Sequence, residues 1–202
     1  MNEQATGLRE RKKRATREAI ARAGLELFVE RGYDETTLAE IAEAAGVSTR
    51  TIFAYFPGKE DILFAALQTM CDALVRALEE RPAGIDALSA LRQFILSSAH
   101  EKTELDHKLG QAIAADPTLA SHRRARIGQL QEAIAAAIAD DLGASVDDRR
   151  PQIAAASLTA AFELLEQDDQ RGPWRTATNE EIAAAIDPVI SFVRDGLEAL
   201  RD

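Results

Sequence analysis

The stretch from Ala45 to Leu63 carries the side chains best suited to bind another molecule. Its sequence, AGVSTRTIFAYFPGKEDIL, combines a turn glycine, several hydroxyls, an arginine and three aromatic rings ahead of a Pro-Gly break. Hydroxyl and guanidinium groups on one exposed face of a helix can donate hydrogen bonds to base edges and to phosphate oxygens. The segment therefore indicates a surface that binds a nucleic acid.

Helix signals on the N-terminal side of this stretch predict the elements that position it. Apolar residues recur at helical spacing over 11–30, which predicts a first helix. Thr37 is followed three residues later by Glu40, the spacing of a capping box, so a second helix is expected over 38–45. The composition is rich in Ala, Leu, Glu and Arg, which favours helix throughout the chain.

A helix-turn-helix pattern follows from the next signals. Gly46 tolerates the left-handed backbone of a tight turn, and Ser48 can cap a third helix that runs to about 55 and stops at 57–58. Two short helices joined by such a turn form this motif. The motif also needs a small residue at the helix crossing and apolar anchors on the second helix, which are provided by Ala42, Val47 and Ile52.

Residues 12–63 resemble the DNA-binding domain of the tetracycline-repressor (TetR) family of bacterial transcription regulators. The motifs LF..RGY..TTL..IA..AGVS and YF..KE.IL carry the resemblance, and beyond them the match is to the family's all-helical architecture. The resemblance implies an all-α fold of about nine helices. It implies a DNA-binding domain with a basic N-terminal arm at 1–58, and a domain for ligand binding and dimerisation at 59–202.

In a recognition helix of this kind, Arg50 is expected to pair with guanine through two hydrogen bonds, which are worth about 1–3 kcal/mol of discrimination. Ser48 and Thr51 can reach a base or a phosphate, and the start of the second helix offers backbone N–H groups to another phosphate. The resemblance implies backbone contacts for Tyr55 and Lys59. The expected DNA-binding set is Thr36, Thr37, Ser48, Thr49, Arg50, Thr51, Phe53, Tyr55 and Lys59.

Phe53 departs from the family pattern, because many members carry tyrosine at this position. Phenylalanine lacks the hydroxyl that meets DNA, although its ring can still contact a thymine methyl or a sugar. The departure indicates that affinity, operator sequence or both differ from those of such members.

Charge is distributed unevenly along the chain. The net charge is −10, yet residues 1–60 hold 10 Lys/Arg and 10 Asp/Glu, so the whole acidic excess lies in 61–202, with 14 against 24. The first 22 residues carry seven basic and three acidic side chains. A basic arm ahead of a neutral block can bind a polyanion locally, although a basic tail that is simply solvated has the same composition.

The last two helical patterns suit a dimer interface. Small alanines gather on one side of 149–168, and an apolar stripe runs through 179–200, with Pro188 predicting a kink near Asp187. The resemblance implies that these two helices of each subunit form a four-helix interface in a homodimer, which places two recognition helices on a palindromic site. Burial of both stripes within a monomer is the alternative.

The resemblance also implies a small-molecule effector bound among the central helices, expected near 84–99, 102–114, 117–121 and 121–142. A long fourth helix, from Lys59 to near Leu78, would carry the effect of the ligand to the DNA. The apolar residues that suit such a pocket are Phe64, Leu67, Met70, Phe94, Leu109, Ile113, Leu130, Ile134, Phe162 and Trp174. The single tryptophan is expected to cap the core, and a lid over the pocket or the interface is the alternative. The C-terminal part looks faintly like acyl-CoA-binding and mycofactocin-type regulators. Arg123, Arg124 and Arg126 suit a phosphate-bearing ligand, although a charged, solvated helix face is the commoner reason for such a cluster.

A metal-binding or catalytic helical bundle is the alternative function, and a purely structural adaptor is a third. One Glu-x-x-His spacing occurs, from Glu104 to His107, but no second copy accompanies it and His100 and His122 lack it. No nucleophile elbow, zinc-protease motif or phosphate-binding loop is present. We therefore expect no catalytic residue, metal or cofactor.

A cytoplasmic location is expected. The single cysteine, Cys71, cannot form an internal disulfide and is expected to be a partly buried thiol. The charged N-terminus lacks the apolar segment of a secretory signal. The most apolar run, over 133–139, is too short to span a bilayer.

Overall fold

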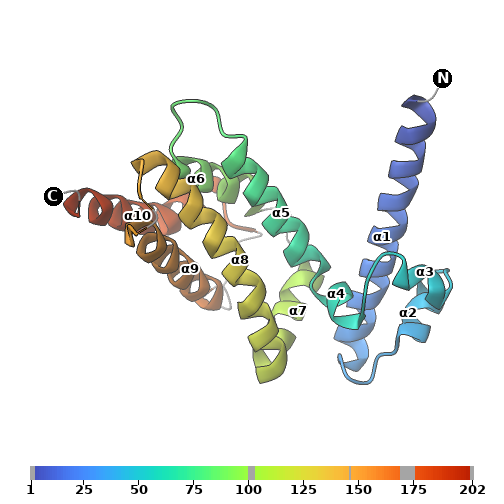
Figure 1. Cartoon of the computed structure of the whole chain (residues 1–202). Coiled ribbons are helices and arrows are strands. Elements are labelled where there is room, and N and C mark those ends of the chain that lie inside the picture. Colours follow the sequence, from blue (N-terminus) through green and yellow to red (C-terminus); the bar gives the residue numbers. More distant parts are fainter. Residues whose placement is uncertain (1–2, 100–102, 146, 169–175, 201–202) are drawn as a thin grey trace. The chain divides into compact units, whose positions relative to one another are not determined.

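The computed structural model describes residues 3–99, 103–145, 147–168 and 176–200, and in these ranges every regular element is one of ten helices (Figure 1). The chain divides into two compact units. Unit 1 comprises Met1–Thr69 and Glu104–Pro117, and unit 2 comprises Met70–Thr103 and Thr118–Asp202. The sequence divides the chain by expected function at 58/59, and that division stays a prediction. The two compact units are defined by packing alone. No helix in the described ranges is both long and apolar enough to cross a bilayer.

Unit 1 packs short helices against one long helix. It holds the helices α1 (Glu3–Arg31), α2 (Leu38–Ala44), α3 (Thr49–Phe53), α4 (Lys59–Leu63) and α7 (Glu104–Ala115), together with the start of α5 (Ala65–Glu79). Helices of five or seven residues are not stable alone in water. They are held by a core that includes the buried side chains of Ile20, Phe28, Ile41, Ile52, Phe56, Ile62, Leu63 and Phe64.

The helix-turn-helix has the geometry that its sequence predicts. Gly46 adopts φ +67° in the turn between α2 and α3. Ala42 is buried at the crossing, and Ile52 of α3 is fully buried. The backbone N–H of Val47 donates to the carbonyl of Ala42 at 2.9 Å, which closes the turn.

Two predictions about helix extent in unit 1 are wrong. The first helix starts before the predicted residue 11, because α1 begins at Glu3. Good helix formers without proline allow the exposed N-terminal turns to continue the helix. The predicted long fourth helix is two helices, because the backbone leaves helical angles at Phe64 (φ −96°, ψ 12°), whose ring is buried in the core.

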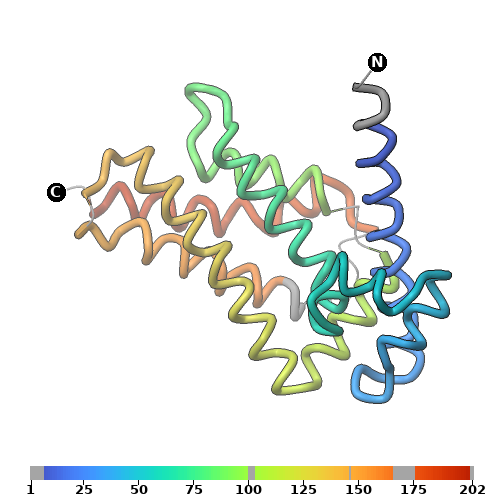
Figure 2. Tube along the Cα trace, turned by 45° about the vertical axis from the view of Figure 1, so that its right-hand side comes forward, coloured from blue at the N-terminus to red at the C-terminus, as the bar shows by residue number. Residues whose placement is uncertain are grey.

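Unit 2 is a bundle made from the rest of α5 with α6 (Ala87–Ser98), α8 (Pro117–Leu142), α9 (Arg150–Asp168) and α10 (Asn179–Ala199) (Figure 2). The predicted segments 117–121 and 121–142 form the single helix α8, and α10 runs through Pro188 as one helix. The described ranges hold ten helices, where about nine were expected. The expected kink near Asp187 stays a prediction. The largest fully buried side chains of the bundle are Leu78, Leu91, Leu158, Ile182 and Ile186.

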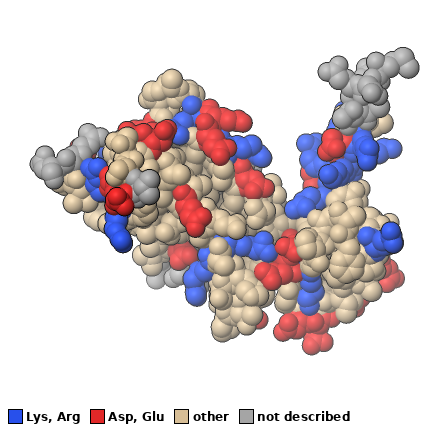
Figure 3. Space-filling view, in the orientation of Figure 1, with Lys and Arg blue, Asp and Glu red and all other residues tan. Residues whose placement is uncertain are grey.

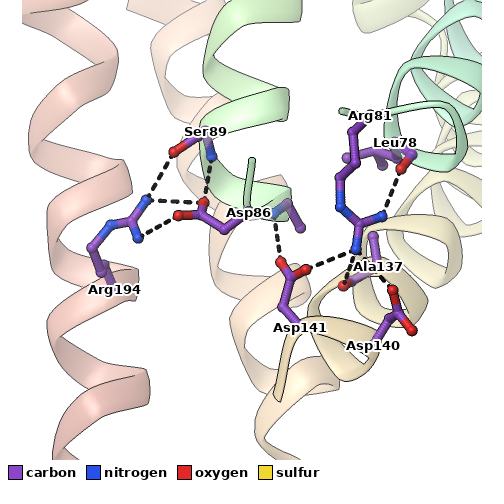
Figure 4. Close-up of polar contacts among 9 residues, drawn as sticks. Leu78, Arg81, Asp86, Ser89, Ala137, Asp140, Asp141 and Arg194 are labelled. Carbon is purple, nitrogen blue, oxygen red and sulfur yellow. Dashed lines mark hydrogen bonds and ion pairs between the residues drawn. The ribbon is translucent and has the colours of Figure 1, made fainter. Parts of the chain in front are cut away.

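Ion pairs tie the loop between α5 and α6 to two other helices (Figure 4). Asp86 caps α6 by accepting from the backbone N–H of Ser89 at 2.7 Å, and its carboxylate also pairs with Arg194 of α10 at 2.8 Å. Arg81 donates to the carbonyl of Leu78 at 2.6 Å and pairs with Asp141 of α8 at 2.7 Å. These contacts fix one end of the bundle.

The Asp86–Arg194 pair makes the stability of unit 2 depend on pH. The hydrogen bond from Arg194, followed by those from Ser89, lowers the pKa of Asp86 from 3.8 to about 2. A carboxylate whose pKa is lower in the folded state stabilises the fold above its unfolded pKa, and this contribution disappears as the pH falls through the folded value.

We therefore expect Asp86→Asn, which keeps a capping oxygen but removes the charge, to lower the free energy of unfolding by about 1 kcal/mol at about pH 7, because both side chains are 40% exposed and solvent screens the pair. The difference should vanish between about pH 4 and about pH 2 in urea unfolding. Asp195→Asn, at an exposed position of α10, is the matched control. A difference that stays constant with pH would contradict this account.

Candidate nucleic-acid interface

The outer face of α3 carries the side chains that the sequence predicts to contact DNA. Thr49 and Arg50 are exposed, and Phe53 is 57% exposed, while Ile52 on the opposite side is fully buried. The Phe53 ring is large and exposed on a helix of only five residues, so it does not serve to pack that helix against the core. This face therefore offers a guanidinium, a hydroxyl and an apolar ring to a partner.

Ser48 and Thr51 form the start of α3. The hydroxyl of Ser48 accepts from the backbone N–H of Thr51 at 3.0 Å, which confirms the predicted N-cap, and the two hydroxyl oxygens lie 2.7 Å apart. Ser48 is exposed and Thr51 is half-buried, so both remain at the surface. Their contact with DNA stays a prediction.

Thr36 does not lie where a DNA contact requires it. Its side chain is only 1% exposed, and its hydroxyl donates to the carbonyl of Gly32 at 2.8 Å. The carbonyl of Leu27 also accepts from it at 3.3 Å. The hydroxyl proton is thus used inside unit 1, mainly at the carbonyl of Gly32, directly after the last turn of α1. The predicted phosphate contact uses backbone N–H groups at this position, and the prediction is wrong for Thr36, because the whole residue is buried and its N–H donates to the carbonyl of Tyr33 at 3.4 Å.

The N-terminus of α2 already holds a negative group. Thr37 and Glu40 form the predicted capping box, with the N–H of Thr37 donating to the Glu40 carboxylate at 2.8 Å. The hydrogen bonds from Thr37 lower the pKa of Glu40, and Arg31 pairs with the same carboxylate at 3.1 Å. Because this carboxylate takes the N–H of Thr37, a phosphate at this helix end would meet a like charge. Thr37 is exposed, and the expected contact between this residue and DNA stays a prediction.

Lys59 has a structural partner that the sequence did not indicate. Its ammonium donates to the carbonyls of Tyr33 at 2.7 Å, Thr36 at 3.1 Å and Asp34 at 3.4 Å. It also lies 4.2 Å from the centre of the Tyr33 ring, within the range of a cation–π interaction. Lys59 therefore ties the start of α4 to the loop between α1 and α2. A phosphate contact would have to draw on the same three protons and stays a prediction.

Tyr55 lies at the end of the α3 segment and is half-buried. Its carbonyl accepts from the guanidinium of Arg17 at 3.0 Å, and this guanidinium lies 4.4 Å from the centre of the Phe56 ring. Sequence reasoning counted Arg17 only as part of a basic arm. The structure shows that it joins α1 to the end of α3.

The residues expected to line an effector pocket divide between the two units. Phe64, Leu67, Leu109 and Ile113 belong to unit 1, where all but the half-buried Leu67 are buried. Met70, at the start of unit 2, is half-buried. Of the remaining candidates, Phe94, Leu130 and Phe162 pack against a cluster in unit 2 that includes Ile134. Trp174 lies outside the described residues, so the effector site stays a prediction.

Metal ligands are not brought together in the described part of the chain, where no group of three His, Cys, Asp or Glu side chains could hold an ion. His107 lies 3.1 Å from the side-chain nitrogen of Gln111, and His100 lies outside the described residues. Cys71 is buried, and burial raises the pKa of its thiol, which keeps it in the unreactive protonated form.

An apolar surface remains exposed on α9 and α10. Ile153 and Leu164 of α9 are 56% and 66% exposed, and Phe192 of α10 is 73% exposed. Between the first two, Ala156 and Ala160 are also exposed, so small and large apolar residues follow one another along the helix. Exposed apolar residues in such a row are typical of protein–protein interfaces.

Comparisons with known proteins agree with this arrangement. The family model of bacterial regulatory proteins of the TetR family matches residues 20–66, and the model of the MftR C-terminal domain matches residues 85–198. The HTH-type transcriptional regulator TcmR of Streptomyces glaucescens is 45% identical over 85 residues, which are 42% of this chain and only 38% of TcmR. MftR of Mycobacterium tuberculosis, named as a mycofactocin biosynthesis regulator, is 26% identical over 186 residues, which are 89% of this chain and 91% of MftR.

A solved structure is similar along most of the chain. The TetR-family repressor FadR of Thermus thermophilus, in complex with lauroyl-CoA, superposes with a TM-score of 0.52 and 28% identity, covering 89% of this chain and 94% of FadR. The likeness thus extends through both units of the chain.

The tie made by Lys59 leads to a testable expectation. Lys59→Met keeps the aliphatic stem but removes three donors to backbone carbonyls, so we expect the free energy of unfolding to fall by about 1–3 kcal/mol. Lys108→Met, at an exposed position of α7, is the control. Chemical denaturation measures the effect. If Lys59→Met leaves stability unchanged and only makes the salt dependence of DNA binding shallower, Lys59 acts through a phosphate contact instead.

Proposed function

The chain belongs to the TetR family of bacterial regulatory proteins, and from this membership we propose that it is a repressor that binds a palindromic operator as a homodimer and leaves it when a small molecule binds. Family members are transcriptional regulators and not enzymes. The proposal assigns DNA binding to 1–58, effector binding and dimerisation to 59–202, and a cytoplasmic location.

The observation that carries the proposal is the outer face of α3, where Arg50 and Phe53 are exposed above the buried Ile52. Such a face can enter the major groove of double-stranded DNA. There Arg50 is assigned to a guanine, and the Phe53 ring to a thymine methyl or a sugar. Ser48, Thr49 and Thr51 supply hydroxyls for bases or phosphates at the start of the same helix.

The homodimer is supported by the exposed apolar row on α9 and α10. A two-fold axis beside these helices would pack the row of one subunit against that of its partner, since an isologous interface uses the same patch twice. Two recognition helices would then meet half-sites about 34–36 Å apart.

The effector is proposed to be an amphipathic molecule with a long apolar part, of the acyl-CoA kind. Two findings support this class of effector. The structure of FadR is a complex with lauroyl-CoA, and partly buried apolar side chains that include Phe94, Leu130 and Phe162 pack against one cluster of unit 2. On α8, Arg124 is exposed and Arg123 and Arg126 are half-buried, so cationic groups are present for a phosphate-bearing portion.

The assignment of Arg50 to a base contact can be tested with DNA duplexes. Those that the wild-type protein retains are first selected from a random-sequence library. We expect palindromic sites, and we expect Arg50→Ala to lose at least about 30-fold of the preference for them over random duplex, because two bidentate guanine contacts, one per subunit and each worth about 1–3 kcal/mol, disappear. Arg22→Ala, at an exposed position of α1, removes the same charge as a control. If Arg50→Ala keeps the full preference, base reading lies elsewhere. If the wild-type protein retains no duplex, the proposed function fails.

The dimer can be tested by placing a charge in the apolar row. We expect Phe192→Glu to sediment as a monomer and to bind only half-sites, because a carboxylate would be desolvated in the interface. The 73% exposed position should leave the fold of the monomer intact, which circular dichroism verifies. Leu8→Glu, at a 52% exposed apolar position of α1, is the matched control for sedimentation. A Phe192→Glu protein that remains dimeric would exclude this face.

A further inference from the structure

The start of α6 joins α8 to α10 within unit 2 (Figure 4). The backbone N–H of Ala87 donates to the carboxylate of Asp141 on α8. The preceding residue, Asp86, accepts from the guanidinium of Arg194 on α10 at both of its carboxylate oxygens, at 2.8 and 3.1 Å. Two adjacent residues therefore link two different helices of the bundle.

Asp141 uses its two carboxylate oxygens for two different partners. One oxygen accepts from the N–H of Ala87, and the other accepts from the guanidinium of Arg81 at 2.7 Å. Arg81 in turn donates to the carbonyl of Leu78, in the last turn of α5, at 2.6 Å. A single carboxylate of α8 thus holds the end of α5 and the start of α6, on both sides of the loop that connects them.

This contact differs from the ion pairs on the open surface. Acidic and basic side chains lie near one another over the visible face of the molecule in Figure 3, and exposed pairs of this kind contribute little to stability. The side chains of Arg81 and Asp141 are only 13% and 27% exposed. A buried charge whose partner is removed is costly, so this pair constrains the helices that carry it.

The helix α6 holds α10 on the side opposite to the exposed apolar residue of α10. Besides the pair of Asp86 with Arg194, Arg92 of α6 donates to both carboxylate oxygens of Asp187 on α10. Positions 187 and 194 are seven residues apart and share one face of the helix, whereas position 192 lies about 200° around the helix from position 194. The 73% exposed Phe192 therefore points away from the side that α6 holds.

We propose that Asp141 is a positioning residue for α10, which acts through the start of α6 and lets the packing of α5 and α8 set the strength of the homodimer. The inference rests on the proposed homodimer and adds a contact on α8, outside the exposed apolar row of α9 and α10. The hydrogen bond to Asp86 raises the pKa of Arg194, and the charge of Asp141 adds to this shift. Because coupling between sites is reciprocal, dimerisation would also stabilise this arrangement of α5, α6 and α8.

Asp141→Asn tests the contact with little change of shape. An amide has one acceptor oxygen, so it cannot accept from both Arg81 and Ala87, and its NH₂ group would face a donor. Subunit exchange between two preparations of the full chain, labelled with different fluorophores at the N-terminus, measures how fast the dimer dissociates. We expect Asp141→Asn to speed exchange at least about 5-fold, since coupling between sites has this size and weakened interfaces differ mainly in dissociation rate.

Asp140→Asn is the matched control. The neighbouring carboxylate of Asp140 also pairs with Arg81, at 3.0 Å, but its side chain is 80% exposed. Loss of such an exposed pair should change the exchange rate by less than about 2-fold. If Asp141→Asn does not fold, Arg81→Lys replaces it. This variant keeps the charge but lacks the planar fork that reaches Leu78 and Asp141 together, so it should also speed exchange.

A double-mutant cycle with Arg194→Met separates positioning from a general loss of stability. Arg194→Met should itself speed exchange, and adding Asp141→Asn should then have little further effect, because residues that act through one network are not additive. A residue that only stabilises unit 2 would leave the exchange rate of the folded dimer unchanged. Circular dichroism verifies that each variant is folded.

Two results would overturn the inference and leave the proposed function intact. Equal exchange rates for Asp141→Asn and Asp140→Asn would show that the carboxylate of Asp141 does not affect the dimer. Additive effects of Asp141→Asn and Arg194→Met would show that the two residues act independently. A wild-type protein that sediments as a monomer would instead overturn both the inference and the proposed homodimer.

Discussion

Unit 1 of this protein depends on one packing constraint, the close approach of α1 and α4 at Gly24. A β-carbon at this position would collide with the side chain of Ile62, so only glycine allows the two helices to meet there. Ile62 is fully buried, as are Ile41 of α2 and Ile52 of α3. Helices this short gain their stability from such contacts and not from their own hydrogen bonds. The outer face of α3 is thus presented by a core that it shares with three other helices.

Polar side chains complete this core by turning inward. Thr36, Lys59 and Arg17 all donate to backbone carbonyls at the ends of helices or in the loops between them. Short helices leave many carbonyls without partners, and buried carbonyls need donors. These inward-facing side chains therefore differ in role from the exposed side chains of α3. Thr36 and Lys59 support the recognition helix, while Arg50, Thr49 and Phe53 remain available to a partner.

Sequence reasoning succeeded where the determining contacts are local. The capping box of Thr37 and Glu40, the cap at Ser48 and the left-handed Gly46 depend on residues no more than three positions apart, and all three were predicted. It failed where partners are distant along the chain. Lys59 reaches carbonyls 23 to 26 residues away, and Arg17 reaches one 38 residues away. The close contact at Gly24 and the break at Phe64 likewise depend on tertiary packing, which no local pattern encodes.

The central claim is that the recognition helix belongs to one cooperative core. Native-state hydrogen exchange of the free protein tests it directly at the amides of Ile41, Ile52 and Phe56, each of which donates to a backbone carbonyl at 2.9 to 3.1 Å. The account predicts that all three exchange only when unit 1 unfolds, with the same free energy of opening. Exchange of Ile52 and Phe56 through a local opening that is at least about 2 kcal/mol easier than that of Ile41 would contradict it.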